Sequence, residues 1–332
     1  MQNFEQEIRQ QPEIIKNILA KHIDNSAFIG FPNISDFAKV TFIASGTSKN
    51  AGDFAAYFFE QIAKIPSKVE FASEILEKNP IFDENDLVVF ISQSGKSADV
   101  LSAFEKIKKT GAKTLAAVNK PDSPLANGAD YKIYLEAGEE LAIPATKSFS
   151  ATVVKLFILA LYFAQKKGLD VSEFIKDLQK LPDATEKILS SKFPSQFAKT
   201  FDAKIFLGRG LCYFALNESA LKLKEASLTE VASLPLGEYV HGHMVTLNST
   251  IPIYAVSFGF DELNSCNLNL INRIKNNYNP PITMITEDIF ALKSKYLTPL
   301  LVVILFQAIA CEISKIKGLN PDEPMGLKKV TE

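Results

Sequence analysis

The sequence contains few of the residues that mark disulfide-bonded or metal-binding proteins. Its 332 residues include no tryptophan, three cysteines and three histidines. Because Cys212, Cys266 and Cys311 are scattered and odd in number, neither a disulfide framework nor a zinc site is expected. This use of cysteine fits a reducing compartment, so we predict a cytoplasmic protein.

Long apolar runs are also missing. The longest are Leu300–Cys311, which Gln307 interrupts, and Leu156–Ala164. Both fall short of the roughly 20 residues that a membrane-spanning helix needs, so each is predicted to be a buried helix. The N-terminal segment is polar and helical in character, which argues against a signal peptide. No membrane association is expected.

The chain has no large excess of charge of either sign. It carries 36 basic and 38 acidic residues, a formal net charge of -2. This balance argues against broad attraction to nucleic acid, which is therefore not an expected partner. Hydrophobic residues make up 47% of the chain, as in globular proteins, and its length suffices for two domains.

An internal repeat organises the sequence. The segment AKVTFIASG at Ala38–Gly46 resembles AKIFLGRG at Ala203–Gly210, since both are apolar strands that end in a glycine turn. A predicted helix follows each one, at Asn50–Ala63 and at Phe214–Ala232. Because the same order occurs twice, the repeat indicates duplication.

Both halves then continue with two further strands and a long apolar helix. These elements are predicted at Asp86–Gly95, Lys113–Asn119 and Ser148–Lys166 in the first half, and at Ile251–Gly259, Pro281–Thr286 and Pro299–Lys317 in the second. Apolar strands that alternate with helices are typical of parallel sheets covered on both faces. We therefore predict an α/β fold of two duplicated domains, each a flavodoxin-like three-layer sandwich.

The predicted division of the chain has five parts. They are a helical prefix over residues 1–37, a first domain over 38–167, a helical linker over 168–199, a second domain over 200–317 and a tail over 318–332. The tail is polar and punctuated by proline and glycine, so it adds no core. We expect it to close over a site.

Hydroxyl-rich loops follow two strands of the first half. Thr47 and Ser48 come after the first strand, and Ser92, Gln93, Ser94 and Ser97 come after the second. Backbone N–H groups and hydroxyls at a helix start can bind a phosphate dianion. The alternative is that these serines only cap helices and form turns. No nucleotide-binding glycine motif is present, so a nucleotide cofactor is not expected.

Candidate acid–base residues lie in the second half. Glu218, Lys222 and Glu225 share one face of a predicted helix, where they would form either a catalytic pair with a cation or a solvated ion-pair network. His241 and His243 follow in a glycine-punctuated loop. They suit proton transfer better than metal binding, because a third ligand at the usual spacing is not evident.

Six segments in order carry a family resemblance. They are SGTS at Ser45–Ser48, SQSG at Ser92–Gly95, ATKSF at Ala145–Phe149, ALKLKE at Ala220–Glu225, a GExxHG pattern at Gly237–Gly242 and LKKVTE at Leu327–Glu332, and EIRQQP at Glu7–Pro12 resembles the opening helix of the same family. They resemble the sugar isomerase (SIS) domain family. The resemblance is to the tandem isomerase half of glucosamine-6-phosphate synthase and, more closely, to stand-alone glucosamine-6-phosphate deaminases of the SIS type.

The resemblance implies a set of substrate-binding residues. Ser92, Gln93, Ser94 and Ser97 would hold the phosphate of a hexose or hexosamine 6-phosphate, Thr47 and Ser48 would contact the sugar, and Ala145 would line the site.

The resemblance also implies the catalytic roles. Glu225 would shuttle a proton between C1 and C2, and Lys222 would support it. His241 would open the sugar ring, reaching into the partner's site of a homodimer. Lys329 would close over the substrate and take part in an imine or assist one. Neither a cofactor nor a metal would be needed.

Departures from the synthase pattern change the expected reaction. Gln2 stands where the synthase has its cysteine nucleophile, Ala145 replaces a serine and Met325 replaces an arginine. Glutamine-dependent amidation is therefore not expected. The expected reaction converts glucosamine 6-phosphate into fructose 6-phosphate and ammonia. The alternatives are a deglycase of fructosamine-type phosphates, another ketose/aldose phosphate isomerase, and a sugar-phosphate sensor without activity.

Overall fold

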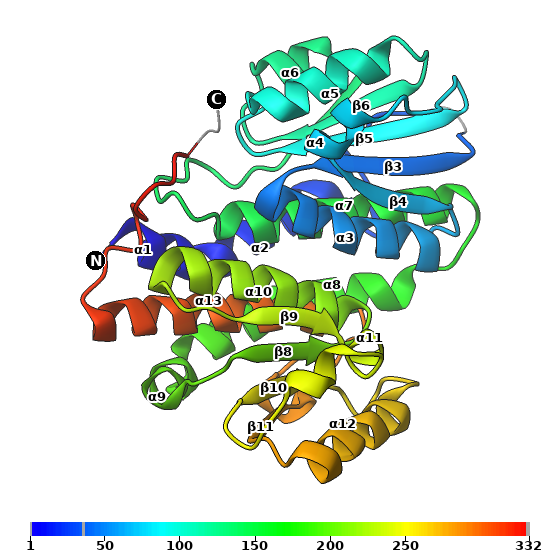
Figure 1. Cartoon of the computed structure of the whole chain (residues 1–332). Coiled ribbons are helices and arrows are strands. Elements are labelled where there is room, and N and C mark those ends of the chain that lie inside the picture. Colours follow the sequence, from blue (N-terminus) through cyan, green and yellow to red (C-terminus); the bar gives the residue numbers. More distant parts are fainter. Residues whose placement is uncertain (1, 35–36, 330–332) are drawn as a thin grey trace. The chain divides into compact units, whose positions relative to one another are not determined.

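A computed structural model describes residues 2–34 and 37–329 of the chain (Figure 1). Two compact units make up the chain, and their segments are interleaved along the sequence. The four-stranded unit consists of Met1–Arg9, Ala142–Pro144 and Lys180–Met325. The five-stranded unit consists of Gln10–Leu141, Ala145–Gln179 and Gly326–Glu332. Helix α8 (Ser172–Ser190) contributes residues to both.

The sheet of the five-stranded unit is parallel throughout. In the part of the chain that the structure describes, its order is β4 (Ser67–Phe71), β3 (Lys39–Ala44), β5 (Asp86–Ser92), β6 (Lys113–Val118) and β7 (Tyr131–Tyr134). The central strand β5, DLVVFIS, is buried at every position. Such a β-branched, apolar strand is the kind that a sheet covered on both faces requires.

Helices cover both faces of this sheet (Figure 1). One face carries α3 (Gly46–Gln61), α7 (Lys147–Lys166) and α2 (Gln11–His22), and the other carries α4 (Ala72–Glu77), α5 (Ala98–Lys108) and α6 (Pro124–Gly128). On the first face the rings of Phe58 and Phe157 meet edge to face, 4.7 Å between centroids. A short hairpin of β1 (Ile23–Asp24) and β2 (Ala27–Phe28) follows α2.

The four-stranded unit has a second parallel sheet. Its order is β9 (Ala232–Pro235), β8 (Ile205–Gly208), β10 (Ile253–Val256) and β11 (Ile282–Ile285). Helix α10 (Leu211–Ser227) packs on β8, on β9 and on α13 (Thr298–Lys317), and α13 also contacts α9 (Phe193–Thr200) and α1 (Asn3–Arg9). A second cluster packs α11 (Leu236–Tyr239), the 3-10 turn η1 (His243–Thr246) and α12 (Asn264–Tyr278) against the strands. The 3-10 turn η2 (Glu287–Ile289) follows β11. The strand order repeats that of β4, β3, β5 and β6.

The predicted α/β class with parallel sheets between helices is confirmed. The sequence did not reveal β4, β7 or β9. All three lie at an edge of their sheets and are only partly buried along most of their length. These three edge strands lack the continuous apolar run that identified β3, β5 and β6, whereas the edge strand β11 has such a run, ITMI, and was predicted.

The two long apolar segments are core helices. Both α7 and α13 are long and apolar enough to cross a membrane by composition alone, yet 89% and 78% of their most apolar windows are buried. This confirms the prediction of buried helices.

A buried lysine interrupts the apolar surface of α7. Lys155 is 2% exposed, and its Nζ lies 2.6 Å from His22 Nε2 and 3.4 Å from Glu136 Oε2. It also lies over the ring of Phe31, and Glu136 pairs with Lys21 as well. Burial lowers the pKa of Lys155 to about 8, although Glu136 opposes the shift.

This lysine predicts how stability depends on pH. Between about pH 8 and 10.5 the unfolded chain binds more protons at Lys155 than the folded chain, so the free energy of unfolding rises with pH. Lys155→Met should remove this rise and raise the free energy of unfolding at pH 7 by roughly 1–3 kcal/mol. Urea titrations at pH 7 and pH 10 measure both effects, with the exposed Lys187→Met as control. A variant that keeps the rise contradicts the assignment.

Candidate functional site

The loop after β5 is shaped for a close approach of its backbone to a ligand. Ser92, at the end of the strand, is buried, and its Oγ accepts a hydrogen bond from the N–H of Gly95 at 3.0 Å. Gly95 has φ +62, and a Cβ there would lie 2.1 Å from Ser123 Oγ. Only glycine fits this turn without strain. Ser94 Oγ accepts from the N–H of Lys96 at 3.2 Å, which fixes the next residues.

The neighbouring loop, after β3, lies at the same edge of the sheet because β3 and β5 are adjacent and parallel. Thr47 and Ser48 form part of the first turn of α3 and are half-buried. Ser45 Oγ donates a hydrogen bond to Asp99 in the first turn of α5, so the two loops are tied together. The two predicted hydroxyl-rich loops therefore stand side by side.

A hollow of about 510 Å³ opens at this edge. It is lined by Gln93, Ser94, Lys96, Lys120, Pro121, Asp122, Ser123, Glu139, Glu140 and Lys329. Its lining carries three lysines and three carboxylates, so it offers cations to an anionic group without a net positive charge. Gln93, Ser94 and Lys329 were all predicted from the sequence, and the structure brings them together here.

The remaining predicted substrate residues surround the same region without lining the hollow. Ser97 occupies the N-cap position of α5, but its side chain makes no capping hydrogen bond. Ala145 is half-buried directly before Thr146, the N-cap of α7. Ser92 and Ser94 do form turn hydrogen bonds, as the alternative for these serines has it, whereas the hydroxyl of Ser97 makes no capping bond; their binding of phosphate stays a prediction.

Sequence reasoning missed four charged residues of the hollow. Lys120 and Asp122 follow β6, the third strand to end at this edge, so the rule that located the serine loops could have found them. Glu139 and Glu140 follow β7, which was not predicted as a strand. Because β7 was not predicted, the sequence pattern could not place Glu139 and Glu140 at this edge of the sheet.

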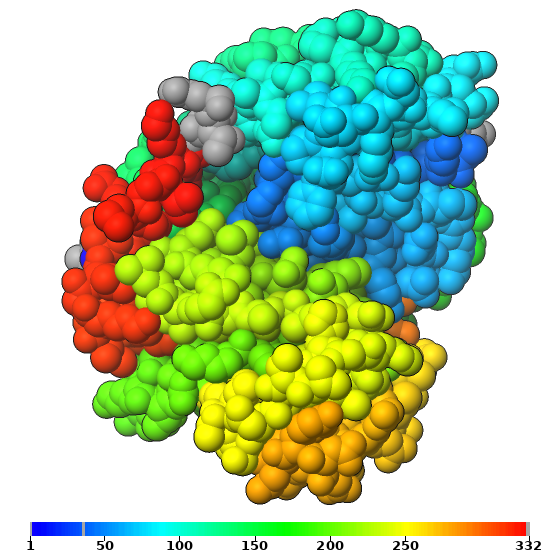
Figure 2. Space-filling view, in the orientation of Figure 1, coloured from blue at the N-terminus to red at the C-terminus, as the bar shows by residue number. Residues whose placement is uncertain are grey.

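Lys329 reaches the hollow from the C-terminal tail. Its Nζ donates to Glu140 Oε2 at 3.1 Å. Residues 325–328 are exposed, and Figure 2 draws the tail in red at the surface. The predicted motif Leu327–Glu332 extends past this point, but Val330, Thr331 and Glu332 lie outside the described residues.

The four-stranded unit holds the predicted acid–base residues on α10. Lys222 Nζ lies 3.5 Å from Glu218 Oε1 and donates to Glu225 Oε2. Lys222 and Glu218 are fully buried, and Glu225 is 20% exposed. The alternative of a solvated ion-pair network is therefore wrong. A buried ammonium needs carboxylate partners of this kind. Of its two partners, only Glu225 reaches solvent.

His241 and His243 lie in the exposed loop around η1. The N–H of His241 donates to the Glu238 carbonyl at 2.9 Å, and its imidazole is exposed. Within the described part of the chain, no group of three or more histidine, cysteine, aspartate and glutamate side chains could hold a metal ion.

The loop after β10 corresponds to the serine loop after β5, but a carboxylate of the same unit occupies it. The N–H of Gly259 donates to Glu287 Oε2 at 2.8 Å, and a Cβ at Gly259 would lie 2.4 Å from Glu287 Oε1. This N–H already has an anionic partner. The edge of the second sheet therefore differs in chemistry from that of the first.

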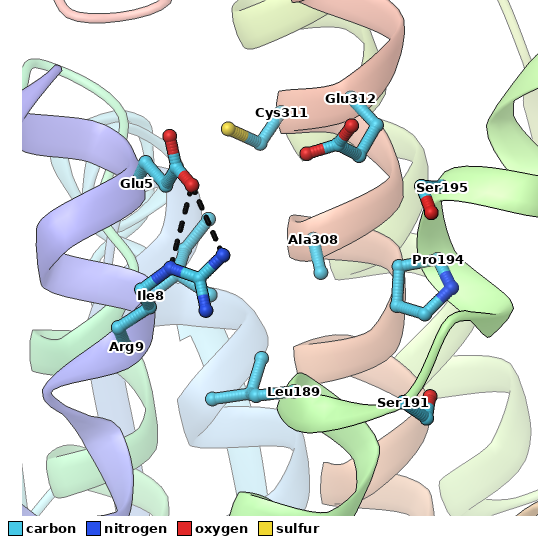
Figure 3. Close-up of a pocket in the computed structure, with 10 residues that line it drawn as sticks. All are labelled: Glu5, Ile8, Arg9, Leu189, Ser191, Pro194, Ser195, Ala308, Cys311 and Glu312. Atoms are coloured by element: carbon cyan, nitrogen blue, oxygen red, sulfur yellow. Dashed lines mark hydrogen bonds and ion pairs between the residues drawn. The ribbon is translucent and has the colours of Figure 1, made fainter. Parts of the chain in front are cut away.

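A smaller hollow of about 100 Å³ lies between α1, α13 and the segment that leads into α9 (Figure 3). Glu5 and Arg9 form an ion pair at 3.1 Å along one wall, and Cys311 points in from α13. Burial raises the pKa of Cys311 to about 12, which makes its thiol a poor nucleophile. None of the predicted site residues lines this hollow.

Comparisons with known proteins agree with this geometry. Residues 33–163 match the family model described as the SIS domain. The chain is 32% identical over 351 residues to the isomerizing glutamine–fructose-6-phosphate aminotransferase of Caldanaerobacter subterraneus, an alignment that covers 97% of this chain and 57% of that protein. The chain thus spans little more than half the length of the curated relatives it matches.

Two solved structures share the fold over nearly the whole chain. The C-terminal domain of glucosamine-fructose-6-phosphate aminotransferase from Francisella tularensis has a TM-score of 0.87 at 27% identity, covering 97% of this chain and 98% of that one. Glucosamine-6-phosphate deaminase from Thermotoga maritima has a TM-score of 0.81 at 22% identity, covering 99% of both chains. The SIS match lies over the sheet strands of the five-stranded unit and over every residue that lines the larger hollow except Lys329, so this part of the chain, residues 33–163, is an SIS domain.

Proposed function

We propose that this SIS-family isomerase converts glucosamine 6-phosphate into fructose 6-phosphate and ammonia. The observation that carries the proposal is the arrangement on α10, where a fully buried lysine holds a partly exposed carboxylate. A carboxylate beside a fixed cation is suited to moving a proton next to a carbonyl carbon.

In this proposal Glu225 is the base. Ring opening exposes the aldehyde at C1, and Glu225 removes the proton from C2 while the C1 oxygen takes up a proton from water, which gives an enolamine. The same residue returns the proton to C1, which leaves an imine at C2. Water adds to the imine carbon, and ammonia departs to give fructose 6-phosphate. Lys222 fixes the orientation of Glu225 and offsets its negative charge through the bond between them.

The five-stranded unit supplies the phosphate site. Ser92, Gln93, Ser94 and Ser97 would hold the phosphate through the loop after β5, and Thr47, Ser48 and Ala145 would contact the sugar. The size of the hollow and the lysines in its wall suit a hexose 6-phosphate.

His241 and Lys329 have the two remaining roles. We assign ring opening to His241, whose imidazole is exposed in a glycine-flanked loop, and closure over the substrate to Lys329. In keeping with the family resemblance, we also propose a cytoplasmic homodimer in which His241 serves the partner's site.

The two sheets support duplication of one ancestral domain. The order β9-β8-β10-β11 matches β4-β3-β5-β6, and all the pairings in both are parallel. The proposal includes the two domains predicted from the repeat, residues 38–167 and 200–317. In the second copy, the Glu287 carboxylate already accepts a hydrogen bond from the N–H of Gly259, which would explain how that copy lost anion binding.

An ammonia-release assay tests the reaction. Purified protein with glucosamine 6-phosphate should give ammonia and fructose 6-phosphate in equal amounts, whereas glucosamine without the phosphate should react far more slowly. Fructosamine-type phosphates and other hexose 6-phosphates are assayed in parallel. Turnover only of these would replace the deaminase with a deglycase or a ketose/aldose isomerase. Binding without any turnover would indicate a sensor.

A further inference from the structure

Glu140 is a fully buried carboxylate at the edge of the larger hollow. Burial of a charge is costly unless hydrogen bonds and an opposite charge compensate it. Three of its hydrogen bonds come from the start of α7. The N–H groups of Thr146 and Ser148 donate to Oε1 at 2.9 and 3.1 Å, and the Ser148 hydroxyl donates to Oε2 at 2.7 Å.

These three donors hold Glu140 in place without any help from the tail. All of them lie at the N-terminus of α7, where the helix dipole also favours a negative charge. The fourth contact is different in kind. It comes from Lys329, 189 residues away in the sequence, whose side chain is 27% exposed. A fixed buried anion therefore meets a cation carried by an exposed segment.

We propose that Glu140 is a positioning residue that docks Lys329, and with it the C-terminal tail, at the mouth of the phosphate-binding hollow. The proposal rests on the proposed function in that Lys329 is the lysine that closes over the substrate. Lys329 lines the hollow together with Gln93 and Ser94, so its ammonium is held beside the loop assigned to the phosphate.

The variant Glu140→Gln separates docking from helix capping. Its amide oxygen can still accept from the N–H groups of Thr146 and Ser148, and the Ser148 hydroxyl can rotate to accept from the amide NH₂. The attraction for Lys329 is lost. The matched control is Glu105→Gln, since Glu105 is exposed on α5 and does not line the hollow.

The first measurement does not depend on the reaction. Trace acetylation with acetic anhydride, read by mass spectrometry, reports how accessible each lysine amine is. In Glu140→Gln the labelling rate of Lys329 should rise at least about threefold, while Lys120, in the same hollow, serves as the internal reference. Unchanged labelling of Lys329 in a folded variant overturns the proposal.

Salt provides a test that needs no variant. In the unmodified protein, raising sodium chloride from about 0.05 to 1 M screens the partly exposed ion pair, so Lys329 labelling should rise relative to Lys120. If Glu140→Gln does not fold, this salt titration of the unmodified protein tests the proposal by itself. A ratio that stays constant with salt would then refute docking by charge.

Kinetics connects docking to turnover. Glu140→Gln should lower kcat/KM roughly tenfold or more, and Glu105→Gln should change it little. In a double-mutant cycle, adding Glu140→Gln to Lys329→Met should cost almost nothing further, because the two residues act as a unit. Independent, additive losses would contradict the positioning role. If labelling behaves as expected but the unmodified protein turns over no hexosamine 6-phosphate, the proposed function fails and the docking contact stands.

Discussion

Glu225→Gln is expected to lower kcat by about 10²- to 10⁴-fold while changing the affinity for fructose 6-phosphate only severalfold. Glutamine has nearly the shape of glutamate, but it cannot accept and return the proton between C1 and C2. The loss therefore appears in the chemical step, and the phosphate loops of the other unit keep their geometry.

The structure indicates that this variant will fold. Lys222 is fully buried, and loss of its only carboxylate would leave an uncompensated charge. Glu218, also fully buried, lies 3.5 Å from the same ammonium and remains as its partner. A loss of activity in Glu225→Gln is thus separable from unfolding, which melting curves can verify.

A control for this experiment lies just beyond the same helix. Glu230 pairs with Lys224 at the surface, is 83% exposed and should tolerate Glu230→Gln without loss of turnover. Steady-state rates and calorimetric titration with fructose 6-phosphate are measured for both variants. Full activity in Glu225→Gln would remove the assigned base and with it the proposed mechanism.

Gly95→Ala should damage both stability and phosphate binding. The new Cβ would require φ +62 in an L-residue and would lie 2.1 Å from Ser123 Oγ and 2.5 Å from Ser123 Cβ. Ser123 is buried and accepts from the N–H of Ala126 as the N-cap of α6, so it has little freedom to move away. Strain and overpacking together should lower the free energy of unfolding by roughly 2–5 kcal/mol.

A second glycine separates the cost of backbone strain from the cost of overpacking. Gly111 has φ +84, but a Cβ there would meet nothing within 4 Å. Gly111→Ala should therefore cost only the backbone strain, about 1–2 kcal/mol, and leave binding of fructose 6-phosphate unchanged. Urea unfolding and calorimetric titration measure both quantities. Equal effects of the two substitutions would show that the contact with Ser123 is unimportant.

Much of the five-stranded unit was predictable because its central strands are apolar along their whole length. Their ends located the loops at Thr47 and at Ser92–Ser97 in advance, since the carboxyl ends of parallel strands share one edge. The same rule, applied to β6, would have added Lys120. Edge strands such as β7 leave no comparable pattern, so the residues that follow them were missed.

Glu140 illustrates what a single sequence cannot reveal. A glutamate in a polar stretch is ordinarily read as exposed, and its burial depends on donors from α7 and on a lysine far along the chain. On α10, spacing alone placed Glu218, Lys222 and Glu225 on one helix face. It could not tell a solvated face from a buried one, because burial is set by other elements that pack against the helix.

The interleaving of the two units has a consequence for biosynthesis. About 150 residues separate Gln179, the last residue of the main part of the five-stranded unit, from Lys329, and nearly all of them belong to the other unit. At translation rates of about 5–20 residues per second, roughly 8–30 s pass between the two. Thr146 and Ser148, which donate to Glu140 in the folded protein, are synthesised shortly after it. The partners of this carboxylate from α7 are therefore available early, whereas Lys329 is synthesised about 150 residues after Gln179.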